Sequence, residues 1–218
     1  MDARSPQRPP PQGAADLLDE LHDAFPNEQV TVQEFLERLE GRAFGLLLLL
    51  LALPMCIPNI PGISTIFGVL LVAPALQMIL GQSKPWLPAR VRAWSFQREH
   101  LQKAIRGATP WLRRIERYIR PRWTVLTRPP VTIFLGLQTL FMAFVLMLPI
   151  PLGNWPPAMT IAMTALALLQ RDGLLVLLAI PAAAASTLVA YAGIRIGIAA
   201  MSELGQLATE FFSTVWPF

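Results

Sequence analysis

The stretch LALPMCIPNIPGIS, from Leu51 to Ser64, places three prolines inside a segment that otherwise has the composition of a membrane helix. Apolar residues precede it from Ala43 and follow it from Ile63 to Leu80. Proline breaks a helix and frees backbone groups, and the interior of a bilayer contains no water to satisfy them. The break must therefore lie at a membrane surface or be buried in protein within the membrane.

The overall composition is that of a membrane protein. Of the 218 residues, 54% are hydrophobic and 15% are charged, and the mean hydropathy is +0.47. Residues 1–42 lack the apolar core of a signal peptide, so we expect the membrane segments to direct insertion without cleavage. Cys56 is the only cysteine and the two histidines are far apart, so neither a disulfide, a metal site nor a cofactor is predicted.

The charges are distributed unevenly along the chain. Residues 1–42 have a net charge of −5, residues 81–128 of +10, and residues 129–218 of −1. Because basic loops remain on the cytoplasmic side, the central segment is predicted to be cytoplasmic. Hydrophobic blocks flank this segment, which favours an anionic lipid surface over nucleic acid as its partner.

The first hydrophobic unit, residues 43–81, has two apolar limbs of unequal length around the break. The first limb has about eleven residues and reaches about 16 Å as a helix, roughly half of the ~30 Å hydrocarbon core. The second limb reaches about 27 Å. Two topologies fit these lengths: a transmembrane hairpin that turns at the far interface, and a re-entrant hairpin that turns inside the membrane.

The second hydrophobic unit, residues 129–201, repeats this pattern. A helix is predicted over Val131–Leu148, followed by the break PIPLGNWPP, a short limb over Ala158–Leu169, the turn QRDG and a long helix over Leu174–Met201. Between residues 51–71 and the residues 95 positions later, eight of 21 are identical, including the Leu-Pro, Asn and Thr-Ile matches. We therefore predict an internal repeat. Paired broken segments are typical of transporter sites, although a repeat can also be purely architectural.

The remaining segments are predicted to be cytoplasmic or peripheral. Residues 1–42 combine a disordered start with amphipathic helices, the second of which begins at a capping box of Thr31 and Glu34 and runs directly into the first hydrophobic unit. Residues 82–128 are expected to form cationic amphipathic helices over Ala89–Gly107 and Pro110–Arg120 that lie in the membrane interface. Residues 202–218 form a tail.

Several motifs resemble the bacterial exopolysaccharide-synthesis ExoD family. They are the run FLERLEGRAFGLLLLLLALPMCIPNIPGISTIFGVLLVAPALQMILGQSKPWLP, the segment RPRWTVLTRPP, and the shorter LPIPLGN and LLQRDGLLVLL. The resemblance extends from about Thr31 to about Ala200 and implies a multi-pass protein of the bacterial inner membrane that is connected with exopolysaccharide production. Members often have Asn where this chain has Met55, and Glu where it has Gln170, which argues against a catalytic carboxylate there.

The candidate site comprises polar and helix-breaking residues of the two breaks. They are Asn59, Pro61, Gly62, Ser64 and Thr65 in the first break and Asn154, Pro156 and Thr160 in the second. Asn side chains and freed carbonyls can line a pocket, but the same residues can simply satisfy the broken backbone. Thr65 and Thr160 open the second limbs, where they can cap helix N-termini that face an anion.

Five further polar residues are candidates outside the breaks. Gln77 and Gln170 are expected to hydrogen-bond across the repeats. Arg171 and Asp172 form either an ion pair or a simple turn. Arg195 lies within an apolar helix, with Asp172 or a lipid phosphate as partner, or with its side chain reaching to the interface.

Together these features predict an all-α integral membrane protein with two repeated helix–break–helix units, re-entrant or spanning, and cytoplasmic amphipathic helices. The sequence contains no nucleophile–base pair, metal cluster, phosphate loop or paired carboxylates, so we expect no enzyme. The expected function is support of exopolysaccharide production, with a lipid-linked or anionic substrate at the breaks. The alternatives are a small transporter or channel not dedicated to polysaccharide, and a lipid-modifying enzyme. Expected partners are membrane lipids, the exopolysaccharide synthesis machinery and a second copy in a homodimer.

Overall fold

Helices make up nearly all of the regular structure. The computed structural model describes residues 29–39, 41–56, 63–97, 99, 102–103, 106–107, 109–110, 113–114, 123–148 and 154–216. Its elements in chain order are β1 (Gln29–Thr31), α2 (Val32–Arg38), α3 (Ala43–Ala52), the 3-10 helix η1 (Leu53–Cys56), α4 (Ile63–Ile79), α5 (Ala89–Arg92), β2 (Ser95–Gln97), the 3-10 helix η2 (Thr124–Thr127), α7 (Val131–Met147), α8 (Trp155–Gln170) and α9 (Gly173–Val215). The helical fold class predicted from the sequence is confirmed.

The two breaks interrupt the helices where the prolines predict. In the first unit, α3 tightens into η1 at Pro54, and α4 begins at Ile63 after the break. In the second unit, α7 ends at Met147 because Leu148, which precedes a proline, is extended. The next helix, α8, has prolines in its first turn, where a missing backbone N–H costs no helical hydrogen bond.

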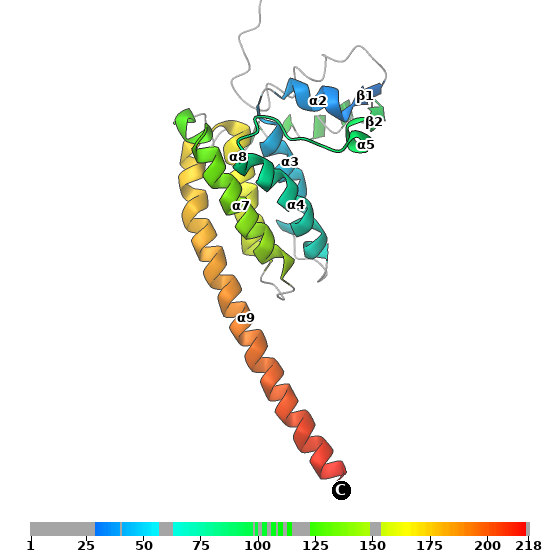
Figure 1. Ribbon diagram of the computed structural model, residues 1–218, viewed down its shortest axis with the longest axis vertical. Coiled ribbons are helices and arrows are strands. Elements are labelled where there is room, and N and C mark those ends of the chain that lie inside the picture. Colours follow the sequence, from blue (N-terminus) through cyan, green and yellow to red (C-terminus); the bar gives the residue numbers. More distant parts are fainter. Residues whose placement is uncertain are drawn as a thin grey trace, which may run out of the picture.

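The four limbs pack crosswise. The first limb of one unit lies against the second limb of the other: α3 packs on α8, and α4 packs on α7 (Figure 1). Glycine brings each pair into backbone contact. A Cβ atom added at Gly45 of α3 would lie 2.8 Å from the Ala165 carbonyl oxygen of α8, and one added at Gly136 of α7 would lie 3.0 Å from the Ala75 carbonyl oxygen of α4. Close backbone approach at small residues is how helices associate when lipid removes the hydrophobic driving force.

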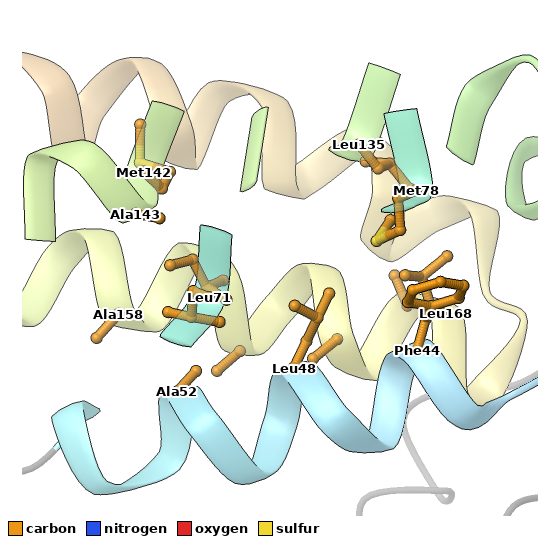
Figure 2. Packing of buried hydrophobic residues seen from close by; sticks show 14 of the residues in the cluster. Phe44, Leu48, Ala52, Leu71, Met78, Leu135, Met142, Ala143, Ala158 and Leu168 are labelled. Atoms are coloured by element: carbon orange, nitrogen blue, oxygen red, sulfur yellow. The ribbon is translucent and has the colours of Figure 1, made fainter. Parts of the chain in front are cut away.

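Both units contribute to a single apolar core. Figure 2 shows Leu48 and Ala52 of α3 facing Leu71 of α4 and Ala158 of α8. Other fully buried members are Leu135, Met142, Ala143, Leu146, Ala165 and Ala167. Because every limb supplies part of this core, neither unit buries its apolar face alone.

The last helix, α9, is much longer than the others. Its 43 residues span about 64 Å at ~1.5 Å per residue. It is the one helix of the described residues that is long and apolar enough to cross a membrane, whereas α3 with η1, α4 and α7 are shorter apolar helices. Its N-terminal half packs on α8 and α7, and its C-terminal half projects beyond the bundle (Figure 1). All side chains of Arg195–Phe212, which we call the extension, are exposed. The helix predicted to end at Met201 therefore continues through much of the expected tail.

The capping box at the start of α2 is confirmed, but the helix that follows is shorter than predicted. The Thr31 hydroxyl accepts from the Glu34 backbone N–H, and the Glu34 carboxylate accepts from the Thr31 N–H, both at 3.2 Å. The prediction that this helix runs into the first hydrophobic unit is wrong. It ends at Arg38, because Gly41 adopts a positive φ of 80° and redirects the chain before α3 begins at Ala43.

A short strand pair replaces part of a predicted amphipathic helix. Antiparallel pairing joins β1 to β2 with Val30 opposite Phe96, so the helix expected over Ala89–Gly107 is wrong at Ser95–Gln97, and α5 has only four residues. The partner strand lies 66 positions away, and helical spacing within the segment could not reveal it. The first amphipathic helix of the N-terminal segment, expected over residues 14–25, and most of the one expected over Pro110–Arg120 lie outside the described residues.

Candidate functional site

A hydrogen bond ties the two breaks together. Asn154 occupies the N-cap position of α8, but its side chain does not cap that helix. Its Nδ2 instead donates to the Ser64 hydroxyl at 2.7 Å, across 90 positions of the sequence. Ser64 lies in the first turn of α4 and is completely buried. This bond therefore joins the starts of the two second limbs, α4 and α8, at the centre of the candidate site.

Thr65 makes a second link between the units. Its hydroxyl donates at 3.2 Å to the carbonyl oxygen of Met147, the last residue of α7. The last four carbonyls of a helix lack partners within it, so Thr65 satisfies one of the groups that the second break exposes. Thr65 was expected to cap the N-terminus of the second limb, but its hydroxyl instead donates to the other unit.

The second polar atom of the Asn154 side chain also lies at this junction. The Asn154 Oδ1 atom is buried and has no hydrogen-bond partner among the described residues. The N-termini of α4 and α8 meet here, and both carry the partial positive charge of a helix start. The junction therefore offers an acceptor to a hydroxyl or amine donor and a favourable potential to an anionic group.

A polar ladder runs from the junction between α7, α8 and α9. The Thr160 hydroxyl lies 2.8 Å from the Ser186 hydroxyl and donates to the Pro156 carbonyl at 3.0 Å. One turn further along α8, Thr164 donates to the Thr160 carbonyl at 3.0 Å and accepts from Gln138 Nε2 at 3.2 Å. Thr160 lies well inside α8, so the expectation that it opens the limb is wrong.

The other members of this ladder were not among the residues predicted from the sequence. Gln138, Thr164 and Ser186 are all buried and come from three different helices. Each is a polar residue inside an otherwise apolar predicted helix, which is a signal that would have marked them. Gln138 Nε2 also contacts the Ala179 carbonyl of α9 at 3.3 Å, so the ladder links all three helices.

Gln77 does not pair with Gln170. Its amide makes two hydrogen bonds to the backbone of Trp86, with Nε2 donating to the carbonyl at 2.9 Å and Oε1 accepting from the N–H at 2.6 Å. Gln77 therefore fixes the loop that follows α4, while Gln170 is buried at the end of α8. The bond across the repeats that was expected of Gln77 is wrong, because Gln77 bonds within its own unit.

The turn between α8 and α9 is built by Arg171 and Asp172. Arg171 ends α8 in the left-handed conformation, with φ of 53°. Asp172 is 2% exposed and caps α9, with Oδ1 accepting from the Leu174 N–H at 2.9 Å. The sequence RDG thus acts as a helix stop followed by a helix start.

Arg195 has a local partner rather than a distant one. Its guanidinium donates to the Tyr191 hydroxyl at 3.0 Å and lies 5.9 Å from the centre of the Tyr191 ring. Asp172 is 23 residues earlier, about 35 Å away along α9, so the predicted pairing with Asp172 is wrong.

Three candidates, Asn59, Pro61 and Gly62, lie outside the described residues. Within the described part of the chain, no group of three His, Cys, Asp or Glu side chains is placed to hold a metal ion.

Large apolar side chains cover the outer faces of the helices. Ile66 of α4, Phe144 of α7 and Leu188 of α9 are each more than half exposed, at 62%, 54% and 70%. Soluble monomers rarely expose contiguous apolar surface of this kind, which marks contact with a membrane or another protein. Together with the length of α9, this exposure indicates association with a membrane.

Comparison with known proteins gives a consistent family match. The family model described as "Exopolysaccharide synthesis, ExoD" matches residues 14–192. Two curated relatives are each 34% identical over 167 residues, or 74% of this chain: an uncharacterised protein of Synechocystis sp., of which 79% is covered, and "Protein ExoD" of Rhizobium meliloti, of which 69% is covered. No solved structure matches the chain. The family match includes both breaks and stops just before the extension.

Proposed function

Because this chain belongs to the exopolysaccharide synthesis ExoD family, which implies a role in exopolysaccharide synthesis, we propose that it supports this process from the bacterial inner membrane. In this proposal it is a multi-pass protein that handles a substrate at the two joined breaks. The substrate is lipid-linked or anionic. The observation that carries the proposal is the hydrogen bond from Asn154 to Ser64, which brings the breaks to one place.

The exposed apolar surface supports insertion into the membrane. The outward faces of α4, α7 and α9 carry apolar side chains, whereas the polar side chains of Ser64, Thr160 and Gln138 are buried between helices. This distribution suits a hydrocarbon solvent, because polar groups in a bilayer must find partners within the protein. The basic segment 81–128 then lies on the cytoplasmic side, facing an anionic lipid surface.

The crosswise packing supports two related units. Each first limb pairs with the opposite second limb through a glycine, Gly45 in one pair and Gly136 in the other. A pair of duplicated units related by a two-fold axis would pack in this way, with the two breaks near that axis. Substrate sites of repeat-containing membrane proteins lie at such junctions of discontinuous helices.

The chemistry that the junction offers is binding. The helix N-termini of α4 and α8 favour a phosphate or carboxylate, and Asn154 Oδ1 can accept from a sugar hydroxyl. We assign no catalysis to the chain, since its hydrophobic units contain almost no acidic side chains. Its partners are membrane lipids and the exopolysaccharide synthesis machinery, and self-association as a homodimer belongs to the same proposal.

The test replaces Asn154 with leucine in a strain that depends on this protein for its polysaccharide. We expect Asn154→Leu to reduce exopolysaccharide several-fold while the protein remains at its normal level in the membrane fraction. Thr65→Val is the matched control, because it removes one bond between the units without touching the unpaired acceptor. A normal amount of polysaccharide from the Asn154→Leu strain would overturn the site. Loss of the variant protein from the membrane would indicate that the break has a structural role.

The paired breaks also favour a second candidate function, a small transporter or channel not dedicated to polysaccharide. Purified protein in phospholipid vesicles would then carry ions or small anions across the membrane. Absence of flux under conditions in which Asn154→Leu still lowers polysaccharide would exclude this second function.

A further inference from the structure

The loop after α4 and the helix α2 enclose a cleft at the end of the bundle where α2, α5, β1 and β2 gather (Figure 1). Gln33, Leu36 and Glu37 of α2 line one side, and Lys84, Trp86 and Arg92 line the other. The cleft is separate from the junction of the breaks, and its described lining includes none of the candidates predicted from the sequence.

The cleft contains two cationic side chains, Lys84 and Arg92. Among the residues that the structure describes, Lys84 and Arg92 make no hydrogen bond or ion pair through their side chains, and the Arg92 Nε atom is buried. Among the described residues that line the cleft, the one acid is Glu37, which accepts from Gln33 Nε2 at 2.9 Å. A buried, unpaired guanidinium N–H is unfavourable, so the cleft is complementary to an anionic acceptor, and phosphate is one of the two anionic groups, with carboxylate, whose geometry a guanidinium matches.

The residues next to the cleft are of the kinds that contact membrane lipids. Trp86 is 60% exposed, yet its backbone is held by both hydrogen bonds of the Gln77 amide. An exposed, firmly held Trp is typical of the level of lipid headgroups. Leu76 in the last turn of α4 and Leu80 directly after the helix are exposed, Leu80 at 73%, and the chain then leads into the loop that carries Lys84. An acyl chain can lie along this apolar face with its headgroup in the cleft.

We propose that this cleft binds the phosphate of a membrane phospholipid through Lys84 and Arg92, with the acyl chains along α4. The inference rests on the membrane insertion in the proposed function, but not on the breaks or on polysaccharide. It also changes the expected mode of lipid contact. The sequence indicated an amphipathic helix lying on the membrane over Ala89–Gly107, whereas the structure offers a discrete headgroup site beside the short α5.

The test counts phospholipid bound to the full-length protein. The protein is purified in detergent, stripped of lipid and titrated with dioleoyl phosphatidylglycerol, and bound lipid is counted by native mass spectrometry. We expect Lys84→Gln with Arg92→Gln to weaken binding about tenfold or more, since charge-assisted hydrogen bonds to the phosphate are lost. The control, Lys103→Gln with Arg106→Gln, removes the same charge outside the cleft and should bind as the unaltered protein does.

Two further ligands identify the source of the phosphate. Dioleoylglycerol, which lacks phosphate, should not bind the cleft, and glycerol 3-phosphate at equal concentration should not displace the lipid. Displacement by glycerol 3-phosphate would overturn the lipid assignment. Equal loss of lipid in the control pair, or no lipid on the unaltered protein, would overturn the site.

Folding and membrane insertion are checked separately. Circular dichroism melting reports whether the double variant folds, and Lys84→Gln alone, at an exposed side chain, is a second variant that should still weaken binding. Resistance of the protein to alkaline extraction from bacterial membranes reports insertion. A protein that is extracted overturns the proposed membrane function, whereas an inserted protein with an empty cleft overturns only this inference.

Discussion

The bundle of α3, α4, α7 and α8 and the extension of α9 have the same secondary structure and opposite surroundings. In the bundle, Gly45 and Gly136 lie against the backbone of a facing helix, and a Cβ atom at either would come within about 3 Å of a backbone carbonyl oxygen. In the extension, Gly197 and Gly205 have open space around them. Helix propensity therefore acts alone in the extension, whereas in the bundle it is overridden by how closely two backbones must approach.

The largest expected effect comes from matched glycine substitutions. Gly45→Ala places a methyl group 2.7 Å from the Leu169 nitrogen, so the pair α3–α8 must separate, at a cost of about 1–3 kcal/mol. Gly197→Ala meets nothing and should stabilise the helix slightly. Thermal unfolding in detergent, followed by circular dichroism, measures both. Equal melting temperatures for the two variants would contradict the close packing of α3 on α8.

A smaller effect is expected from removing one side chain of the polar ladder. Gln138→Leu leaves the Thr164 hydroxyl without its donor, and we expect a loss of about 1–2 kcal/mol. Gln206→Leu makes the same chemical change in the extension, where the residue is exposed, and should alter stability by less than about 0.5 kcal/mol. Chemical denaturation of both variants in the same detergent makes the comparison. If Gln138→Leu is as stable as the unaltered protein, the ladder contributes nothing to stability.

The cap of α9 should have an effect of about 1 kcal/mol. Asp172→Ala removes the acceptor for the Leu174 N–H, whereas Asp172→Asn retains it, because Asn caps helices about as well as Asp. We therefore expect alanine to lower the melting temperature and asparagine to leave it nearly unchanged. A large loss with asparagine as well would show that the carboxylate charge, rather than the cap, stabilises this turn.

The smallest effect is expected from removing the extension. Deletion of residues 195–218 removes the extension, whose side chains are exposed, so the bundle should melt at the same temperature, with no measurable change. Melting of the purified shortened protein tests this directly. A lower melting temperature would mean that the extension is covered in the intact protein, by lipid or by a second copy.

Much of the helical layout could be predicted from local sequence. The apolar runs and prolines predicted the limbs that became α3, α4, α7 and α8, and the capping box of Thr31 and Glu34 is formed. These features are local, because a proline or an N-cap acts within one turn of its own helix. The prediction failed where residues far apart in sequence decide the outcome. The pairing of Val30 with Phe96 and the bonds of Gln77 to Trp86 are two examples.

The candidate site was predicted only in part. The sequence marked Asn154 and Ser64 separately, as polar residues of two matched breaks, but could not show that they bond to each other. It did not mark Gln138 and Ser186, although each is a polar residue inside an otherwise apolar helix. Their importance appears only when α8 is placed between α7 and α9.

The sequence by itself determined the helical class, the positions of the breaks and the family, because composition, proline and motif act along the chain. Only the tertiary structure decided that the limbs pair crosswise and that the two breaks meet. The physical reason is that helix pairing depends on where one backbone can approach another. Gly45 permits that approach only opposite Ala165 and Leu169, 120 and more residues away, and no local pattern of apolar residues specifies such a partner.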